Sequence, residues 1–282
     1  MKVALVSMKH VPRDVPANLE RQLFWLERAR EAGARFVGFP EASLTGWADD
    51  CTQPLALTSA PLRTLADYAR RHRLFIGTCF IEKRAGRLYN SAAVFGPQGR
   101  LGVMRKVNLV DREAHLYAPG RAFPVFEVAG CRMGIATCAD ATRFEMHHLL
   151  ALRGAEVIFA PHANILAHYG GTIDGWAKWR LERWPLFAKD TRSVILGVNC
   201  AGLFEGKRPG DERSPYCGGA MIVNEQGKIV TRLRGAHQRE GLIVAEIDVA
   251  AIRRERAKPD FMANEFQASI IYNRREGWAF GK

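Results

Sequence analysis

The 282-residue sequence contains no hydrophobic run long enough to cross a membrane. Its opening segment, residues 1–9, has too short an apolar run for a signal peptide and lacks a small-residue cleavage site. The hydrophobic content of 48% and the charged content of 25% are typical of a water-soluble globular protein. We therefore expect a cytoplasmic protein that has no membrane partner.

The six cysteines include no Cys-x-x-Cys pair, and without an export signal they do not indicate a disulfide framework. Cys79 and Cys200 lie within apolar, strand-like runs, where cysteine usually serves as a small core residue. Glycine-rich phosphate loops are also absent, both the Gly-x-Gly-x-x-Gly and the Walker pattern. These absences argue against a disulfide-stabilised secreted protein and against a nucleotide-binding enzyme.

Acidic residues are outnumbered, 29 against 41 lysines and arginines, which gives a net charge of +12. The basic residues are nevertheless scattered. The densest clusters, at 70–73, 253–256 and 274–275, are short and carry no interleaved aromatic residues for base stacking. We expect a solvated, arginine-rich surface and no nucleic-acid partner.

Strand-like and helix-like segments alternate along the chain, with no low-complexity tract and no clear domain boundary. Strands are expected at 3–7, 36–39, 74–80, 91–95, 133–137, 157–160, 194–199, 219–223, 228–233 and 242–247. Helices are expected at 18–32 with Asn18 as N-cap, after Ser59, at 144–153, from about 174 with a kink or restart at Pro185, and after Asp248. This mixture favours α/β or α+β layers in one domain, 1–282, with 255–282 as an arm that packs on a partner.

Cys138 ends an apolar, strand-like run at 133–137, and a helix-like segment follows it. At such a turn we expect the side chain to leave the rim of the sheet and point at solvent. The unpaired N–H groups at the start of the next helix would then favour the thiolate over the thiol. Buried strand-end cysteines are also common, but these features make Cys138 a candidate nucleophile.

Glu41 and Lys106 are charged residues at places where a buried strand predicts apolar ones. Glu41 comes directly after the run 36–39 and Pro40, and Lys106 interrupts the run 103–110. Each has an ordinary explanation: a solvated loop carboxylate, and an edge-strand lysine whose ammonium group reaches water. Neither segment alone assigns a catalytic role.

Three segments taken together are informative: Phe-Pro-Glu-Ala-Ser-Leu-Thr-Gly at 39–46, Arg-Lys-Val-Asn-Leu at 105–109 and Gly-Ile-Ala-Thr-Cys-Ala-Asp at 134–140. Their order and spacing resemble the nitrilase-type carbon–nitrogen hydrolases. Segments at 152–158, 198–199 and 218–227 look like the same family, so the resemblance runs from residue 1 to about residue 248. Each motif is weak by itself, but the ordered set is specific.

The resemblance implies an α/β fold, a four-layer α-β-β-α sandwich that dimerises by packing helical layers together, so we expect a homodimer or a higher homo-oligomer. It also implies hydrolysis of a small-molecule amide or N-carbamoyl group through a Cys138 thioester, with no metal and no organic cofactor. Glu41 would act as the base, and Lys106 with the Ala139 N–H would stabilise the oxyanion. Glu113 is the best match to a further supporting acid in this family, with Asp111 as the alternative.

Departures from the family pattern bear on the substrate. Nitrilases tend to carry Trp-Glu after the nucleophile, whereas Ala-Asp follows Cys138 here, so the resemblance is closer to amidases and carbamoyl hydrolases. Thr142 stands where many relatives have arginine, and Arg143 lies one place beyond, which puts carboxylate recognition there in doubt. Asn108 replaces a histidine that is usual two residues after the lysine, a change expected to alter pocket polarity more than mechanism.

Other interpretations remain open. A papain-like pair would join Cys138 to His162 or His115, although we expect His162 to line the pocket and contact substrate. Glu145 and His148 have the Glu-x-x-His spacing of di-iron bundles, but a second copy is missing. The functional alternatives are a nitrilase acting on a nitrile and a non-catalytic binding or scaffold protein of the same fold. The remaining aromatic cluster is predicted to pack a helix: Trp176, Trp179 and Trp184.

Overall fold

The computed structural model describes residues 1–47, 53–110, 113–169, 173–204, 214–234, 239–259 and 261. Its strands form two six-stranded sheets, ordered β12-β1-β2-β3-β4-β5 and β11-β10-β9-β8-β7-β6. The first sheet contains β1 (Lys2–Ser7), β2 (Phe36–Gly38), β3 (Phe75–Arg84), β4 (Arg87–Gly96), β5 (Gly99–Arg105) and β12 (Gly241–Glu246). The second contains β6 (Val125–Val128), β7 (Cys131–Ile135), β8 (Val157–His162), β9 (Val194–Asn199), β10 (Ala220–Val223) and β11 (Ile229–Leu233).

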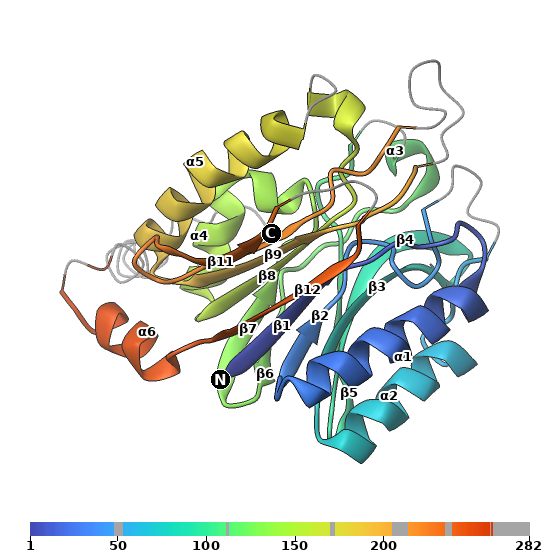
Figure 1. The fold of residues 1–282 in the computed structure, drawn as a ribbon, viewed down its shortest axis with the longest axis horizontal. Coiled ribbons are helices and arrows are strands. Elements are labelled where there is room, and N and C mark those ends of the chain that lie inside the picture. Colours follow the sequence, from blue (N-terminus) through green and yellow to red (C-terminus); the bar gives the residue numbers. More distant parts are fainter. Residues whose placement is uncertain are drawn as a thin grey trace, which may run out of the picture.

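Each sheet has three parallel strands at its centre, β1-β2-β3 in one and β7-β8-β9 in the other, with antiparallel strands outside them. The long helices cover the two outer faces, α1 and α2 on the first sheet and α4 and α5 on the second (Figure 1). The helices are α1 (Val15–Glu31), α2 (Ala60–His72), α3 (Glu113–Leu116), α4 (Phe144–Leu152), α5 (Ile173–Thr191) and α6 (Val249–Arg256). This is the predicted four-layer α-β-β-α sandwich. Among the described helices, none has the length and apolarity to cross a bilayer.

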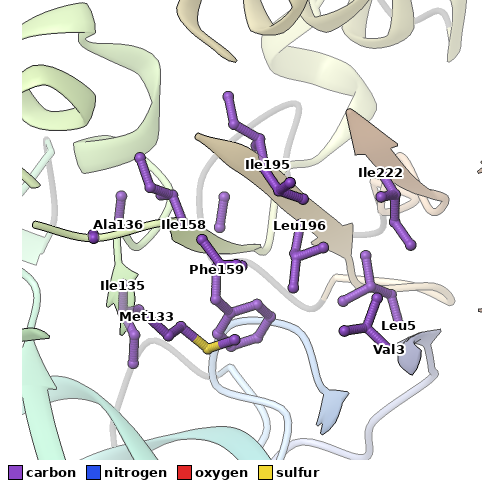
Figure 2. Packing of buried hydrophobic residues seen from close by; sticks show 14 of the residues in the cluster. Val3, Leu5, Met133, Ile135, Ala136, Ile158, Phe159, Ile195, Leu196 and Ile222 are labelled. Atoms are coloured by element: carbon purple, nitrogen blue, oxygen red, sulfur yellow. The ribbon is translucent and has the colours of Figure 1, made fainter. Parts of the chain in front are cut away.

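Alternation along the strands divides the core into two layers. In β1, Val3 and Leu5 pack between the sheets, whereas Ala4 and Val6 face α1 and α2. Phe159 of β8 lies in the inter-sheet layer together with Val3 and Leu5 (Figure 2). Its ring fills space that two glycines of the opposite sheet leave open. A Cβ added to Gly38 would lie 2.6 Å from the ring, and a Cβ added to Gly77 would lie 2.9 Å from it.

The carboxyl ends of the central strands of the two sheets meet at one end of the sandwich. Ser7 Oγ donates to Asn199 O at 2.8 Å, which joins the ends of β1 and β9. The Glu41 N–H donates to His162 O at 3.3 Å, which joins the segment after β2 to the end of β8. Loops that leave these strands are therefore brought together from both sheets.

Several local predictions were wrong in detail. Asp14, not Asn18, caps α1 by accepting from Ala17 N at 3.0 Å; Asn18 is buried and bonds to both Val11 N and Val11 O. α5 continues through Pro185, so the expected restart is absent, and the alternative of a kink stays a prediction. β5, which ends at Arg105 within the strand-like run 103–110, and β6 were not among the expected strands. Most of the expected arm at 255–282 lies outside the described residues, namely 260 and 262–282. Cys51 and the side chain of Trp176 also lie outside them.

Candidate active site

Cys138 lies in the turn that follows β7. Its backbone has φ of 49°, in the left-handed region that costs a non-glycine residue about 1–2 kcal/mol. Its N–H donates to Pro161 O at 2.9 Å, and its carbonyl accepts from Ala141 N at 2.9 Å. The abrupt end of the strand predicted from the sequence is therefore present, and hydrogen bonds on both sides hold the strained turn.

The expectation that Cys138 points at solvent and rests as a thiolate is wrong. Cys138 is only 9% exposed. Burial raises the pKa of its thiol to about 12, and the charge of Glu41 raises it as well, with Lys106 acting in the opposite direction. The resting group is therefore a thiol, and it needs a neighbouring base. The Glu41 carboxylate is close enough to contribute to this shift, which makes it the candidate base.

Glu41 follows β2 and Pro40 and is 1% exposed. The next residue, Ala42, has φ of 52°, so a strained turn supports this side chain as well. The carbonyl of Glu41 lies 3.3 Å from Cys200 Sγ. Cys200 and Cys79 are fully buried, as predicted for small core residues.

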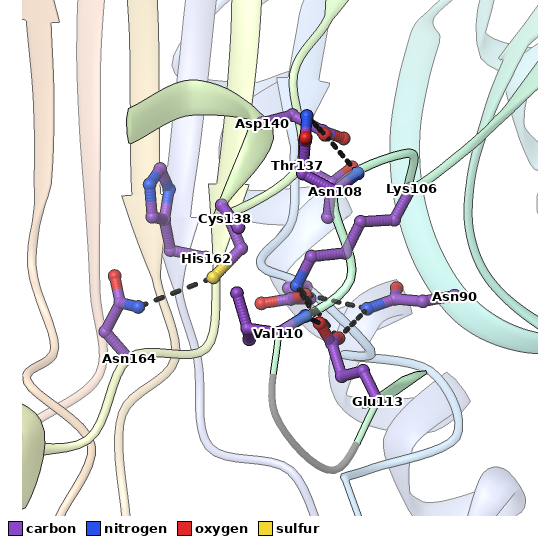
Figure 3. A network of polar contacts seen from close by, with 12 residues as sticks. Asn90, Lys106, Asn108, Val110, Glu113, Thr137, Cys138, Asp140, His162 and Asn164 are labelled. Atoms are coloured by element: carbon purple, nitrogen blue, oxygen red, sulfur yellow. Dashed lines mark hydrogen bonds and ion pairs between the residues drawn. The ribbon is translucent and has the colours of Figure 1, made fainter. Parts of the chain in front are cut away.

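Lys106 lies between two carboxylates, one residue beyond β5. Its Nζ donates to Glu41 Oε1 at 2.9 Å and to Glu113 Oε1 at 2.8 Å (Figure 3). Asn90 of β4 donates to the same two oxygens, at 2.7 and 3.0 Å, and the Val110 N–H donates to Glu113 Oε2 at 3.0 Å. The predicted supporting acid Glu113 is thus in contact with the lysine, whereas its alternative Asp111 lies outside the described residues.

This cluster keeps Lys106 positively charged. Burial by itself would lower the pKa of the lysine, but the favourable electrostatic interactions with Cys138, Glu41 and Glu113 outweigh it and raise the pKa well above its usual value. An ammonium group has three protons, and two of them are used by the carboxylates. Among the described residues no acceptor takes the third, which is available to an oxygen of a bound molecule.

Asp140 ties the loop after β5 to the turn that carries Cys138. Its Oδ1 accepts from Asn108 N at 2.8 Å and from Asn108 Nδ2 at 2.7 Å, and its Oδ2 accepts from Val107 N at 3.2 Å. Asn108, which stands at the position of the usual histidine, therefore contacts the turn directly (Figure 3).

The Ala139 N–H adjoins the thiol and finds no acceptor within the described ranges of the chain. Its neighbours in the turn are paired, since Asp140 N donates to Thr137 O at 3.0 Å and Cys138 N to Pro161 O. A donor left available in this way suits an oxygen that becomes negative beside the sulfur.

The structure brings His162 near the nucleophile but turns its ring away from the thiol (Figure 3). The ring packs on Trp184 with centroids 5.4 Å apart, and Nδ1 lies 2.8 Å from Ala160 O. Burial and the charge of Arg180 lower the pKa of His162 well below its usual value, so it is a poor base. His115 is exposed on α3, so neither histidine supports a papain-like pair. Contact of His162 with substrate stays a prediction.

The other candidates lie away from this cluster. Arg143 and Glu145 are exposed at the start of α4, and Thr142 Oγ1 bonds to Ala139 O at 2.8 Å. Within the described residues, no group of three or more His, Cys, Asp or Glu side chains could hold a metal ion.

Three buried residues escaped sequence reasoning: Asn90, Asn164 and Arg180. Asn164 Nδ2 lies 3.4 Å from Cys138 Sγ, and Arg180 of α5 donates to Asn164 Oδ1. Asn90 carried a weak signal as a polar residue next to the expected strand 91–95. Arg180 carried none, because arginine is an ordinary residue on an amphipathic helix.

Comparisons with known proteins are consistent with this geometry. The model of the carbon–nitrogen hydrolase family matches residues 2–257. A nitrilase of Pyrococcus abyssi is 27% identical over 288 residues, 99% of each chain, and omega-amidase NIT2 of Bos taurus is 28% identical over 263 residues, 88% of each chain. The crystal structure of Nit3 of Saccharomyces cerevisiae, a member of branch 10 of the nitrilase superfamily, has a TM-score of 0.77 at 24% identity and covers 92% of this chain and 94% of its own.

Proposed function

Because the chain belongs to the carbon–nitrogen hydrolase family, we propose that it hydrolyses a small-molecule amide or N-carbamoyl compound with Cys138 as the nucleophile. One observation carries this proposal: the Cys138 thiol, the Glu41 carboxylate and the Lys106 ammonium group share one buried site, although they come from both sheets. A binding or scaffold protein would have no use for a strained cysteine beside a buried carboxylate.

In the first half of the reaction, Glu41 takes the thiol proton while the sulfur attacks the carbonyl carbon. The carbonyl oxygen becomes negative and accepts from the Ala139 N–H and from the third proton of Lys106, each donor contributing roughly 3–4 kcal/mol. Glu41 then passes its proton to the departing nitrogen, the carbon–nitrogen bond breaks, and ammonia or an amine leaves behind a thioester on Cys138.

In the second half, Glu41 removes a proton from water, and the water oxygen attacks the thioester carbon. The same two donors hold the oxygen, the carbon–sulfur bond breaks, and the sulfur regains the proton from Glu41. Glu113 and Asn90 act by holding Lys106 and Glu41 in place.

Amides are the preferred substrate class, because omega-amidase NIT2 of Bos taurus is a relative over most of the chain and Ala-Asp follows the nucleophile. Nitriles are a second candidate, because the relative from Pyrococcus abyssi is a nitrilase. Ammonia release from simple amides, N-carbamoyl amino acids, ω-amides of dicarboxylic acids and nitriles separates these classes. We expect release from one class, none in Cys138→Ala, and losses of about 10²-fold or more in Lys106→Ala. Full activity of Cys138→Ala would contradict the mechanism.

The chain is further proposed to act as a single catalytic domain that forms a cytoplasmic homodimer. Both sheets share one core cluster, which supports a single domain. Five described cysteines are free thiols, which suits a reducing compartment. Leu149 of α4 and Leu186 of α5 are 37% and 58% exposed on the outer helical layer, where a second copy would cover them. Light scattering of the wild type should give twice the mass of one chain, and Leu186→Glu should lower the measured mass. A wild type with the mass of one chain would exclude the dimer.

A further inference from the structure

Asn164 links the candidate nucleophile to a buried arginine. It follows β8, and its Nδ2 lies 3.4 Å from Cys138 Sγ (Figure 3). On its other side, Asn164 Oδ1 accepts a short hydrogen bond from Arg180 Nη2. Arg180 is only 1% exposed, so this guanidinium group is held in the interior beside the site.

The arginine determines which way the amide of Asn164 points. A guanidinium group carries only donors, so the atom that faces it must be the amide oxygen. The amide NH₂ must therefore face the sulfur, where it can only donate. The orientation follows from hydrogen-bond chemistry and does not depend on telling nitrogen from oxygen at this position.

Both partners are firmly held. The backbone of Asn164 is clamped by Asn199, whose Oδ1 accepts from Asn164 N at 2.7 Å and whose Nδ2 donates to Asn164 O at 3.0 Å. Arg180 Cζ lies 5.2 Å from the ring of Trp179 and 5.4 Å from that of Trp184. The donor therefore reaches the sulfur without having to be ordered first.

A donor at this place counteracts a specific difficulty of the site. Removing the thiol proton creates a negative sulfur in a buried position beside carboxylates, which is unfavourable. Lys106 lies on the carboxylate side of Cys138, and Asn164 lies on the other side (Figure 3). An N–H polarised by a buried guanidinium group donates more strongly to an anion than an isolated amide does.

We propose that Asn164 is a further catalytic residue that stabilises the Cys138 thiolate, and that Arg180 is the positioning residue that holds its amide. The role belongs to the thioester mechanism proposed above. Asn164 donates to the sulfur when Glu41 takes its proton, and again when the carbon–sulfur bond of the thioester breaks and the electron pair returns to sulfur. Asn164 itself neither gains nor loses a proton.

Alkylation of Cys138 by iodoacetamide tests the proposal without any substrate. Trypsin should release residues 133–143, in which Cys138 is the single cysteine, so mass spectrometry can follow this thiol alone. Asn164→Asp retains the shape and a partner for Arg180 but offers no donor to sulfur, and Asn164→Ala removes the donor without adding charge. We expect both variants to be alkylated about 10- to 100-fold more slowly near neutral pH, with the pH dependence shifted upward.

Three further variants separate this role from general damage. Asn18→Asp makes the same change at another buried asparagine, far from the sulfur along the chain, whose side chain bonds to Val11 N and Val11 O, so its Cys138 should react as in the wild type. Arg180→Lys should retain more reactivity than Arg180→Met, because a cation can still hold the amide oxygen. Alkylation of both Asn164 variants within about twofold of the wild type, less than one hydrogen bond to an anion provides, would overturn the proposal.

The alkylation assay also distinguishes the two proposals. If the wild type releases no ammonia from any compound of the panel but its alkylation depends on Asn164, the hydrolytic function fails and thiolate stabilisation stands. If the wild type hydrolyses amides and the Asn164 variants retain both kcat and alkylation rate, the hydrolytic function stands and the role of Asn164 is refuted.

Discussion

Lys106→Met removes the positive charge that lies between two buried carboxylates. Lys106 Nζ is 2.9 Å from Glu41 and 2.8 Å from Glu113, and these side chains are 1–3% exposed. At an effective dielectric constant of about 20, each contact corresponds to about 6 kcal/mol of attraction before desolvation is subtracted. Because removing one partner of a buried ion pair costs about 3–5 kcal/mol net, we expect the variant to lose that much free energy of unfolding near neutral pH.

The loss should shrink as the pH falls. Burial raises the pKa of Glu113, Lys106 lowers it and Glu41 raises it, so removing Lys106 raises this pKa further. A folded-state pKa above the unfolded value of about 4.3 means that the folded protein takes up a proton that the unfolded chain does not. The variant therefore regains stability as the pH falls toward the pKa of Glu113 in the unfolded chain. It loses stability as the pH rises through the pKa of Glu113 in the folded protein.

Urea denaturation of wild type and Lys106→Met at about pH 7.5 and about pH 5.5 measures this effect. Combining the change with Glu113→Gln, which removes one of the two charges, should restore part of the lost stability at the higher pH. Glu113→Gln alone is the matched control. The reasoning would be refuted if Lys106→Met lost the same free energy of unfolding at both pH values and Glu113→Gln restored none of it.

Three other outcomes are expected. Glu41→Gln should fold normally but lower kcat by about 10²-fold or more, as measured with the substrate found in the panel, and an unchanged kcat would remove Glu41 as the base. EDTA should leave the activity unchanged; loss that zinc restores would contradict a mechanism carried by side chains and backbone alone. Gly120→Ala would bring a Cβ within 2.0 Å of Arg105 O, next to the hydrogen bond of 2.8 Å from Gly120 N to Lys106 O. It should lower thermal stability by about 1–3 kcal/mol and lower kcat, and a variant as stable as the wild type would show that this loop adjusts freely.

The resemblance of three ordered segments to one family predicted the four layers and pointed to Glu41, Lys106 and Cys138, whereas the pattern of strands and helices alone predicted no more than α/β or α+β layers. The ionisation state of the thiol was predicted wrongly. The local sequence offers only the helix that follows Cys138, whereas burial and a carboxylate from the opposite sheet determine its pKa. Such contributions are not visible in a segment read alone.

Asn90 and Asn164 were missed for a related reason. Asn90 bonds to Glu41 across 49 positions of sequence, and Asn164 bonds to Cys138 across 26. The residues near each asparagine in the chain do not identify this distant partner. The burial of Arg180 likewise depends on how α5 packs against the second sheet.

The position of the reacting groups between the two sheets gives core packing a second consequence. Cys138 is carried by one sheet, Glu41 and Lys106 by the other, and Phe159 against Gly38 and Gly77 sets how closely the sheets approach. We therefore expect kcat to depend on the distance between the two sheets. Enlarging Gly77 should therefore alter kcat, because a Cβ at this position would press on Phe159 and shift one sheet against the other.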